Sequence, residues 1–496
     1  MKRIIQISIF VLFLIGSNSN LFAQERYGLS NSLYAGENGI WLNPASMVNS
    51  PFKWDLNILS LDIYTDNNYL YLSDANIPKL YKNKGKIPVL VNNHANEQIS
   101  GIMLYERDNN YRRTLHLNGM VQGPSLMVSF KKWSFAFHIA ERFGVSLTGL
   151  KKNAAKLFFE GLTYEPMQNI DINVPSFRLN ALAWTEFGVS AGREIKNDNK
   201  RLIKAGITYK YNRGNFGAYL LNQGVRLFVP SDSIIIFNEL NADYGYTNFG
   251  TSPLSAVGQG HGLDLGVSIE KKIIKHDYKC PNFCDKKRNV YYAWKLGASI
   301  LDFGYIKFDN TANTYEIRNG YAEWTNLGSL SANDFASFDT SISDHFYNSP
   351  KPNVISHTFT SWLPTAISIQ ADYNIGYNFF INGTVVQRIP HFGAPGIDRV
   401  NSLAITPRFD HRRFGIALPI VLYGYVNPRI GLAIRLNNNI IVGTDNLGSF
   451  IGHNLSGTDI YVSLKVNVLK KCKKSKEKKE FDPGRKKSHS KSIGGN

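Results

Sequence analysis

The sequence predicts an all-β protein, a transmembrane antiparallel β-barrel of about 14 strands with up to about 18 candidate segments. Three observations predict it. Apolar and polar residues alternate along many segments of about 9–13 residues, which are long enough to cross a bilayer at a tilt. Phe, Tyr and Trp make up 13% of the 496 residues, whereas charged residues make up only 19%. Short polar stretches separate the alternating segments, as hairpin turns do.

The segment from His261 to Glu270 shows the alternation most plainly. Its odd positions from Leu263 onward are apolar, and its even positions include Asp264 and Glu270. The same period of two recurs at 203–210, 290–302, 367–374, 429–436 and 460–467. In the segment 290–302, the even positions from Tyr292 to Ile300 are expected to face lipid. A soluble sandwich alternates as well. However, a Lys or Arg at mid-depth on a lipid face costs about 2–4 kcal/mol, so charges restricted to one face favour the membrane barrel.

Turn and loop lengths predict the orientation of the barrel. Short turns are expected at 196–200, 410–413 and 437–439, and longer connections near 144–180, 230–260, 303–360 and 443–459. Outer-membrane barrels have short periplasmic turns and long outer loops, so the short turns are placed in the periplasm. Counting strands back from the chain end then puts the segment 270–289 on the periplasmic side too.

The first residues predict export. Met1, Lys2 and Arg3 precede an apolar run that is too short for a spanning helix, and Ala23 offers a small residue for cleavage, which is typical of a signal peptide. We therefore expect a signal peptide at 1–23, an N-terminal plug at 24–52, the barrel at 53–469 and a basic disordered periplasmic tail at 470–496. Export together with a membrane barrel predicts the outer membrane of a Gram-negative cell.

A large part of the net charge of +18 lies at the end of the chain. The segment 470–496 holds eleven basic residues against three acids, among them Lys470, Lys471, Lys473, Lys474, Lys478 and Lys479. Because an exported protein does not meet nucleic acid, the expected partners are outer-membrane lipid for the barrel and peptidoglycan or an acidic periplasmic protein for the tail. The alternative interpretation of the tail is a solvated run of charge. We expect the barrel to be a monomer.

Three cysteines are too few for a disulfide scaffold. Cys280 and Cys284 would close a small loop in an oxidising compartment, or they would remain free thiols. Only His276 lies close to them, so the sequence predicts no metal site. The sequence also contains no nucleophile elbow, zinc-protease motif or phosphate-binding loop, so we expect no catalytic residue, no cofactor and no enzyme activity.

Charged residues on the polar face of the strands are the candidate lumen residues. They are Arg142, Glu186, Lys204, Lys210, Asp264, Glu270, Lys295, Asp372, Arg408, Arg429 and Arg435. Such side chains would line a pore and select its solute. Alternatively, they would pair with each other and fill a plugged barrel, since charge on the inner face costs little. The sequence leaves both interpretations open.

The N-terminal segment does not alternate, and it carries a motif. Gly36 and the run from Ile40 to Ser46, which contains Asn43, Pro44 and Ala45, resemble the N-terminal signature of FadL-like outer-membrane barrels. The resemblance implies a plug, or hatch, inside a barrel of about 14 strands. It also implies a transport channel for a small amphipathic ligand, although the lipid-uptake positions of that family have no match here.

Two further resemblances extend this interpretation. PorV, a barrel of type IX secretion systems, is similar, which implies as an alternative an adaptor or envelope-assembly barrel that holds periplasmic or secretion partners. The motif together with the blocks 122–127 and 133–137 also resembles an uncharacterised outer-membrane family of Bacteroidota, a domain of unknown function. This last resemblance spans nearly the whole chain after residue 23.

Overall fold

The computed structural model describes residues 25–83, 103–247, 256–273, 292–325, 335–349, 351–391 and 393–470. The expected signal peptide, the segment with Cys280 and Cys284, and the tail beyond Lys470 lie outside the described residues. Within the described residues, no helix is both long enough and apolar enough to cross a membrane.

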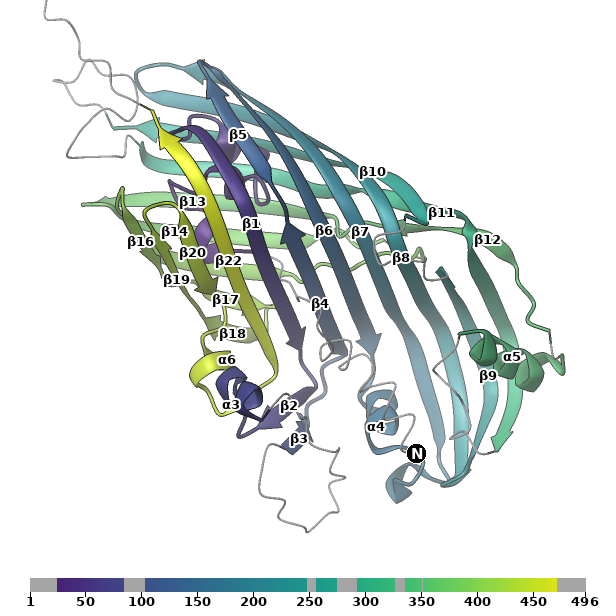
Figure 1. Cartoon of the computed structure of the whole chain (residues 1–496). Helices are drawn as coiled ribbons and strands as arrows, with labels where there is room; N and C mark the ends of the chain where they lie inside the picture. Colours follow the sequence, from purple (N-terminus) through teal and green to yellow (C-terminus); the bar gives the residue numbers. More distant parts are fainter. Residues whose placement is uncertain are drawn as a thin grey trace, which may run out of the picture.

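A single antiparallel sheet closes on itself, because its first strand, β1 (Phe52–Asn67), pairs with its last, β22 (Gly457–Leu469) (Figure 1). The result is a barrel of 14 strands, which confirms the predicted fold class. Between β1 and β22 the wall consists, in order, of β4 (Arg113–Gln122) with β5 (Ser125–Phe130), β6 (Trp133–Leu150), β7 (Asp171–Asn197), β8 (Arg201–Ser231), β9 (Ile234–Thr247) with β10 (Gly258–Lys272), β11 (Tyr292–Thr325), β12 (Ser356–Trp362) with β13 (Ala366–Gly376), β14 (Phe379–Arg388), β15 (Ser402–Asp410), β16 (Phe414–Ala417) with β17 (Ile420–Tyr423), β18 (Asn427–Ile430) with β19 (Leu432–Leu436), and β20 (Ile440–Thr444).

The two faces of the wall follow the predicted alternation. In β10 the apolar side chains of Leu265, Val267 and Ile269 are 41%, 51% and 40% exposed on the outside of the barrel, whereas Asp264 and Glu270 are buried inside. An exposed apolar band of this kind is stable only in contact with hydrocarbon. The outer face therefore marks the barrel as a membrane-spanning one.

The strand β11 departs from the predicted alternation at two bulges. Tyr292 was expected to face lipid, but it is buried inside and its hydroxyl donates a hydrogen bond to Asp372 at 2.5 Å. The pairing of β10 with β11 is irregular at Lys272, and an extra residue in a strand shifts the phase of its side chains. A second irregularity lies at Asp302, whose φ of +51° turns both Leu301 and Asp302 inward.

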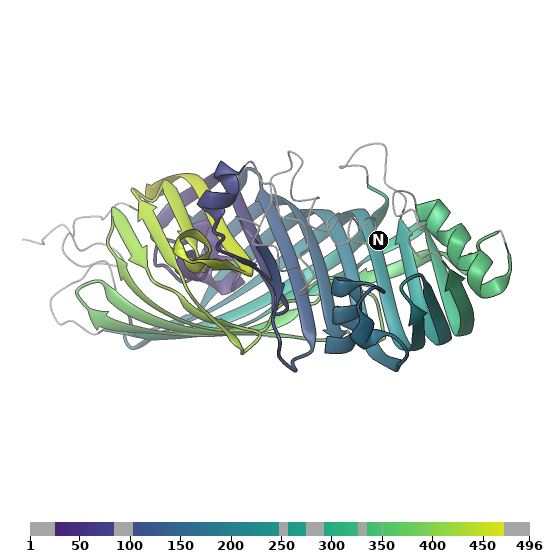
Figure 2. The same ribbon diagram turned by 90° about the horizontal axis from the view of Figure 1, so that it is seen from below.

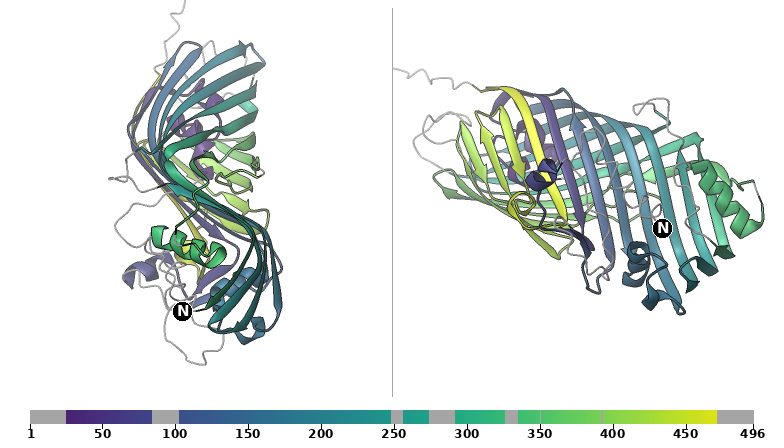
Figure 3. Two further views of the ribbon diagram at one scale, coloured as in Figure 1. Left: turned by 90° about the vertical axis from the view of Figure 1, so that its right-hand side faces the viewer. Right: turned by 60° about the horizontal axis from the view of Figure 1, so that its bottom comes forward.

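Several predicted long loops are partly strand. β6 and β7 occupy much of 144–180, β9 lies within 230–260, and β11 runs far into 303–360. The strands β7, β8, β9 and β11 continue past the barrel as a curved sheet, on which α4 (Lys152–Glu160) and α5 (Phe335–Tyr347) lie (Figures 2 and 3). Two apolar clusters join the sheet to the helices, which explains why these residues form strands although they lie beyond the lumen. We call this part the sheet extension.

One end of the barrel carries the short turns. The turn end holds the start of β1, the end of β22 and the turns at 131–132, 198–200, 377–378, 411–413 and 437–439. The end of β10 and the start of β11 also lie there, since Lys272 pairs with Tyr292 and donates its backbone N–H to Lys200. These strand ends are thus on the same end as Lys470, as the strand count predicted.

The remaining elements are short. Inside the barrel lie α2 (Tyr27–Ser30) and the 3-10 helices η1 (Gly36–Gly39) and η2 (Pro44–Met47). At the end opposite the turns lie a small sheet of β2 (Leu70–Ser73), β3 (Met103–Glu106) and β21 (Asn454–Leu455), together with α3 (Ile77–Lys82), η3 (Glu165–Met167) and α6 (Gly448–Ile451).

Candidate functional site

Residues 25–50 lie inside the barrel, and we call this segment the hatch (Figure 1). Its fold follows from its motif. Asn43 caps η2 by accepting the backbone N–H of Ala45 at 2.9 Å, and Pro44 suits the first helical position. Gly36 has a φ of +61°, and a Cβ there would lie 2.0 Å from a carboxylate oxygen of Asp55, so only glycine fits.

Three glycines of the wall form the surface on which the hatch lies. Gly192 of β7 faces Gly206 of β8, and Gly206 faces Gly266 of β10, so the three form a row that we call the glycine track. A Cβ on Gly206 would lie 2.5 Å from the carbonyl carbon of Pro44, and a Cβ on Gly266 would lie 2.2 Å from the side-chain oxygen of Asn43. The missing side chains therefore let the hatch backbone touch the wall directly.

Polar contacts fix the hatch at this position. The side-chain amide of Asn43 donates to the backbone oxygen of Val267 at 3.1 Å and to the side-chain oxygen of Gln370 at 2.9 Å. Nearer the start of the hatch, the guanidinium of Arg26 donates to Asp62 at 2.6 Å, with both side chains buried. Lys465 of β22 donates to the backbone oxygen of Ala35 at 2.7 Å and also pairs with Asp55 at 2.6 Å.

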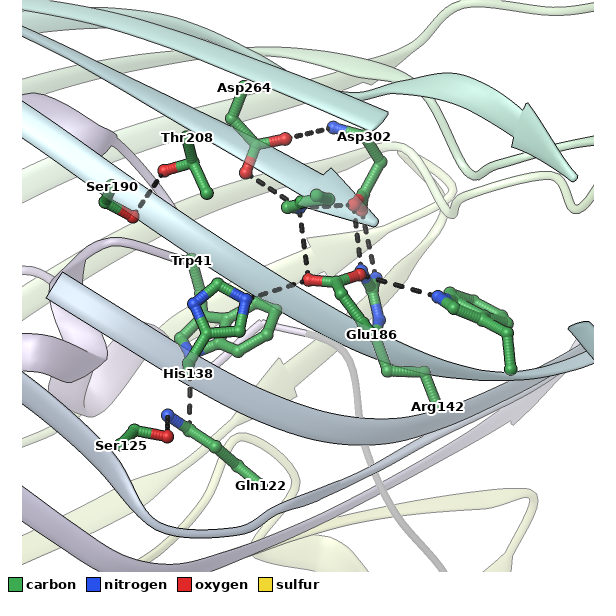
Figure 4. A network of polar contacts seen from close by, with 12 residues as sticks. Trp41, Gln122, Ser125, His138, Arg142, Glu186, Ser190, Thr208, Asp264 and Asp302 are labelled. Atoms are coloured by element: carbon green, nitrogen blue, oxygen red, sulfur yellow. Dashed lines mark hydrogen bonds and ion pairs between the residues drawn. The ribbon is translucent and has the colours of Figure 1, made fainter. Parts of the chain in front are cut away.

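A network of charges crosses the lumen beside the hatch (Figure 4). We call it the central cluster; its members are His138, Arg142, Glu186, Lys210, Asp264, Asp302 and Arg399. The guanidinium of Arg142 donates two hydrogen bonds to Asp302, at 2.8 and 3.0 Å, and one to Glu186 at 2.8 Å. The ammonium of Lys210 lies 2.7 Å from both Asp264 and Asp302. Asp302 also accepts from Arg399 at 2.8 Å, so this one carboxylate binds three cations.

The hatch covers the central cluster with an aromatic ring. The indole of Trp41 donates to the side-chain oxygen of Gln122 at 3.2 Å, and its ring lies 4.6 Å from that of His138. The charged groups of Arg142 and Lys210 each lie 5.6 Å from the centre of the Trp41 ring. Cations are attracted to the face of a tryptophan, so this contact helps to hold the hatch, together with the ion pair between Glu25 and Arg399 at 3.3 Å.

The structure brings each predicted lumen residue to the inner face, next to an opposite charge. The contacts are Arg142 with Glu186 and Asp302, Lys210 with Asp264, Lys204 with Glu270 at 2.5 Å, Lys295 with Asp372 at 3.9 Å, Arg408 with Asp372 at 2.7 Å, Arg435 with Asp410 at 3.4 Å, and Arg429 with Asp66. Two cavities along the hatch measure about 10 and 60 Å³, which is room for water only. The hatch therefore leaves little free volume beside it at these two places.

Sequence reasoning missed Asp302, the residue with the most partners in the central cluster. In a regular strand it would have faced lipid with Ile300, and the bulge turns it inward. One signal was present, because the lipid-facing apolar positions change from even before Ile300 to odd from Phe303 onward. The glycine track and the Arg26–Asp62 pair were missed as well, since they are defined by contact between the hatch and the wall.

The closed wall, its apolar outer face and the hatch in its lumen define a plugged, membrane-spanning β-barrel. The chain belongs to a family of unknown function, DUF5723, whose model matches residues 44–445. No curated protein matches the chain.

Solved membrane barrels are similar at low identity. The toluene transporter TbuX of Ralstonia pickettii is 10% identical with a TM-score of 0.39, and the match covers 91% of this chain and 99% of the transporter. A FadL homologue of Pseudomonas aeruginosa is 10% identical with a TM-score of 0.28, covering 90% and 99%. The outer-membrane protease OmpT of Escherichia coli is 6% identical with a TM-score of 0.24, covering 84% and 98%.

Proposed function

We propose that this protein is an outer-membrane channel, shut in this structure by its hatch, that passes a small amphipathic ligand. The observation that carries the proposal is the hatch itself. An N-terminal segment fills the lumen and rests on the bare backbone of the glycine track, while wall charges such as Arg142 with Asp302 and Lys210 with Asp264 are paired with each other. A segment held in this way is able to leave without unravelling the wall.

The chemistry of the lumen supports an amphipathic ligand. Aromatic rings are buried there beside the paired charges, that of Trp184 at Arg142 of the central cluster and that of Phe380 at Arg408. Rings offer apolar contact, and paired charges offer hydrogen bonds without a strong net field. A solute with one apolar and one polar part would find both. The outer-membrane location is supported by the apolar outer face, since spanning β-barrels are proteins of such membranes.

Uptake into proteoliposomes tests the channel. Purified full-length protein and a variant without residues 27–50 would be reconstituted, and entry of a small amphipathic fluorophore would be followed against empty liposomes. We expect slow entry with the full-length protein and fast entry with the variant, because deletion removes the hatch and leaves the wall. If the variant is folded and passes neither the probe nor ions, the protein is not a channel.

An adaptor that holds a partner is the second candidate, and the sheet extension favours it. The extension stands beyond the lumen and adds nothing to a pore, yet it carries two helices and two apolar clusters. Affinity purification from detergent-solubilised membranes would compare the full chain with a variant lacking 470–496 and with one lacking α5. Partners lost from either variant would support the adaptor. The adaptor would be contradicted if the full chain and both variants all purified without a partner protein.

A further inference from the structure

Three cations lie on the lipid-facing side of neighbouring strands at the turn end. Arg193 of β7, Arg201 of β8 and Lys271 of β10 are all exposed. Outward-facing apolar residues of the same strands lie beside them, such as Val189 and Ile269, which are 58% and 40% exposed. Arg201 and Lys271 pair at the strand ends, whereas Arg193 pairs with Ala205, four positions further from the turn, and the apolar Ile195 is exposed beyond it. The three cations therefore lie within the edge of the hydrocarbon-facing band. We call these three residues the outer cation row.

The side chains of the outer cation row form no ion pair with a carboxylate in the described part of the chain. Of the acids close to them in sequence, Glu194 accepts from Asn197, and Asp198 pairs with Lys196 and accepts the backbone N–H, not the guanidinium, of Arg201 at 2.6 Å. Arg201 stands directly opposite Lys271 across the β8–β10 pair. Like charges in that arrangement repel each other, so an anion bound between Arg201 and Lys271 would remove this electrostatic repulsion.

Aromatic rings frame the row at the same boundary. The guanidinium of Arg193 lies 4.9 Å from the centre of the Trp133 ring, and Lys271 stands opposite Trp294. The turn that holds Lys132 is joined to this site, because the backbone N–H of Glu194 donates to the Lys132 carbonyl at 2.8 Å. Tryptophan beside Arg and Lys at the edge of an apolar band is typical of the headgroup level of a membrane.

We propose that Arg193, Arg201 and Lys271 bind the phosphates of anionic phospholipid headgroups in the leaflet around the turn end. Arginine guanidinium groups match phosphate oxygens in pairs. A lipid fits better than a soluble polymer, because these residues lie on the hydrocarbon-facing side and not at the tips of the turns. The choice of a phospholipid over the phosphates of lipid A rests on the proposed outer-membrane location, in which short turns face the periplasm.

Native mass spectrometry of the full-length protein tests the site. The protein would be equilibrated in detergent with equal amounts of phosphatidylglycerol and phosphatidylcholine, and separately with lipid A. We expect retention of phosphatidylglycerol over phosphatidylcholine by at least about tenfold, a preference that salt weakens. The triple variant Arg193→Gln, Arg201→Gln, Lys271→Gln should retain both lipids equally.

A matched control removes the same charge from the same end. Lys53, Arg412 and Arg413 are exposed cations of the turn end outside the row, and their replacement by Gln should leave the preference intact. Arg201→Gln alone relieves the repulsion with Lys271, so it should fold at least as well as the wild type and show a smaller preference. Equal loss in the control, no discrimination by the wild type, or retention of lipid A in place of phosphatidylglycerol would overturn the proposal. Because lipid retention is measured without transport, the result is independent of whether the barrel is a channel.

Discussion

Replacing Gly206 with alanine should loosen the hatch while the barrel stays folded. The new Cβ would lie 2.5, 2.6 and 2.7 Å from the Pro44 carbonyl carbon, the Pro44 oxygen and the Ala45 nitrogen. All three are backbone atoms, so no side chain is able to rotate away, and the hatch has to move off the wall. Overpacking of this kind costs about 1–3 kcal/mol. That energy shifts the balance between the docked and undocked hatch by about 5–150-fold.

Hydrogen exchange of the hatch amides measures this shift. Where exchange reports the opening equilibrium, peptides covering 26–50 should exchange about 5–150 times faster in Gly206→Ala than in the wild type, and the strand peptides should not change. Gly383→Ala is the control, because a Cβ at that position of β14 has no atom within 4 Å. Both variants lose the same backbone freedom in the unfolded chain. Unchanged hatch exchange in a folded Gly206→Ala, or equal acceleration in the control, would refute the seating of the hatch described here.

Three further predictions concern the charges of the lumen. Asp302→Asn should lower the free energy of unfolding by about 3–5 kcal/mol in urea titrations in detergent, because buried cations lose their shared carboxylate. Asp309 is exposed on the same strand and serves as the control: Asp309→Asn should change the free energy of unfolding by less than about 0.5 kcal/mol. Arg26→Gln should speed hydrogen exchange around α2 and η1 but not around Asn43, since it removes the contacts with Asp62 and with Asn38. Equal acceleration along the whole hatch would show that the two anchors open together. The variant lacking 27–50 should pass K⁺ and Cl⁻ with little preference in planar bilayers, and a strongly selective current would contradict the pairing of the lumen charges.

The fold was predictable because alternation is a local property. Whether a residue such as Asp264 or Leu265 faces the lumen or lipid depends on its position parity alone, as long as the strand is regular. The same reasoning failed at Tyr292 and Asp302, because one inserted residue reverses the parity of the positions after it. The insertion at Asp302 depends on a backbone φ of positive sign, which cannot be read from the sequence.

The sheet extension and the contacts of the site needed the structure. A long connection was expected near 230–260. β9 nevertheless forms there, because β8 and β11 pair with it on both sides and α5 covers it. In the central cluster, Arg142 and Asp302 are 160 residues apart in sequence. The alternation of the sequence predicted that Arg142 faces the lumen, but it did not identify the residue that pairs with Arg142.

The contacts between the wall and the hatch determine how the barrel opens. The pairs Arg142–Asp302 and Lys465–Asp55 join wall to wall, so they survive when the hatch leaves. Undocking breaks two ion pairs, those of Arg26 with Asp62 and of Glu25 with Arg399. It also breaks hydrogen bonds along the whole hatch, from Tyr27 with Asp445 to Asn43 with Gln370, and the packing of apolar hatch side chains on the wall. Water entering the lumen is able to replace each of the polar contacts. The closed and open states therefore differ by the contacts along the whole hatch and not by a rearrangement of the wall, so a ligand shifts the balance only as far as its differential affinity for the open state offsets those contacts.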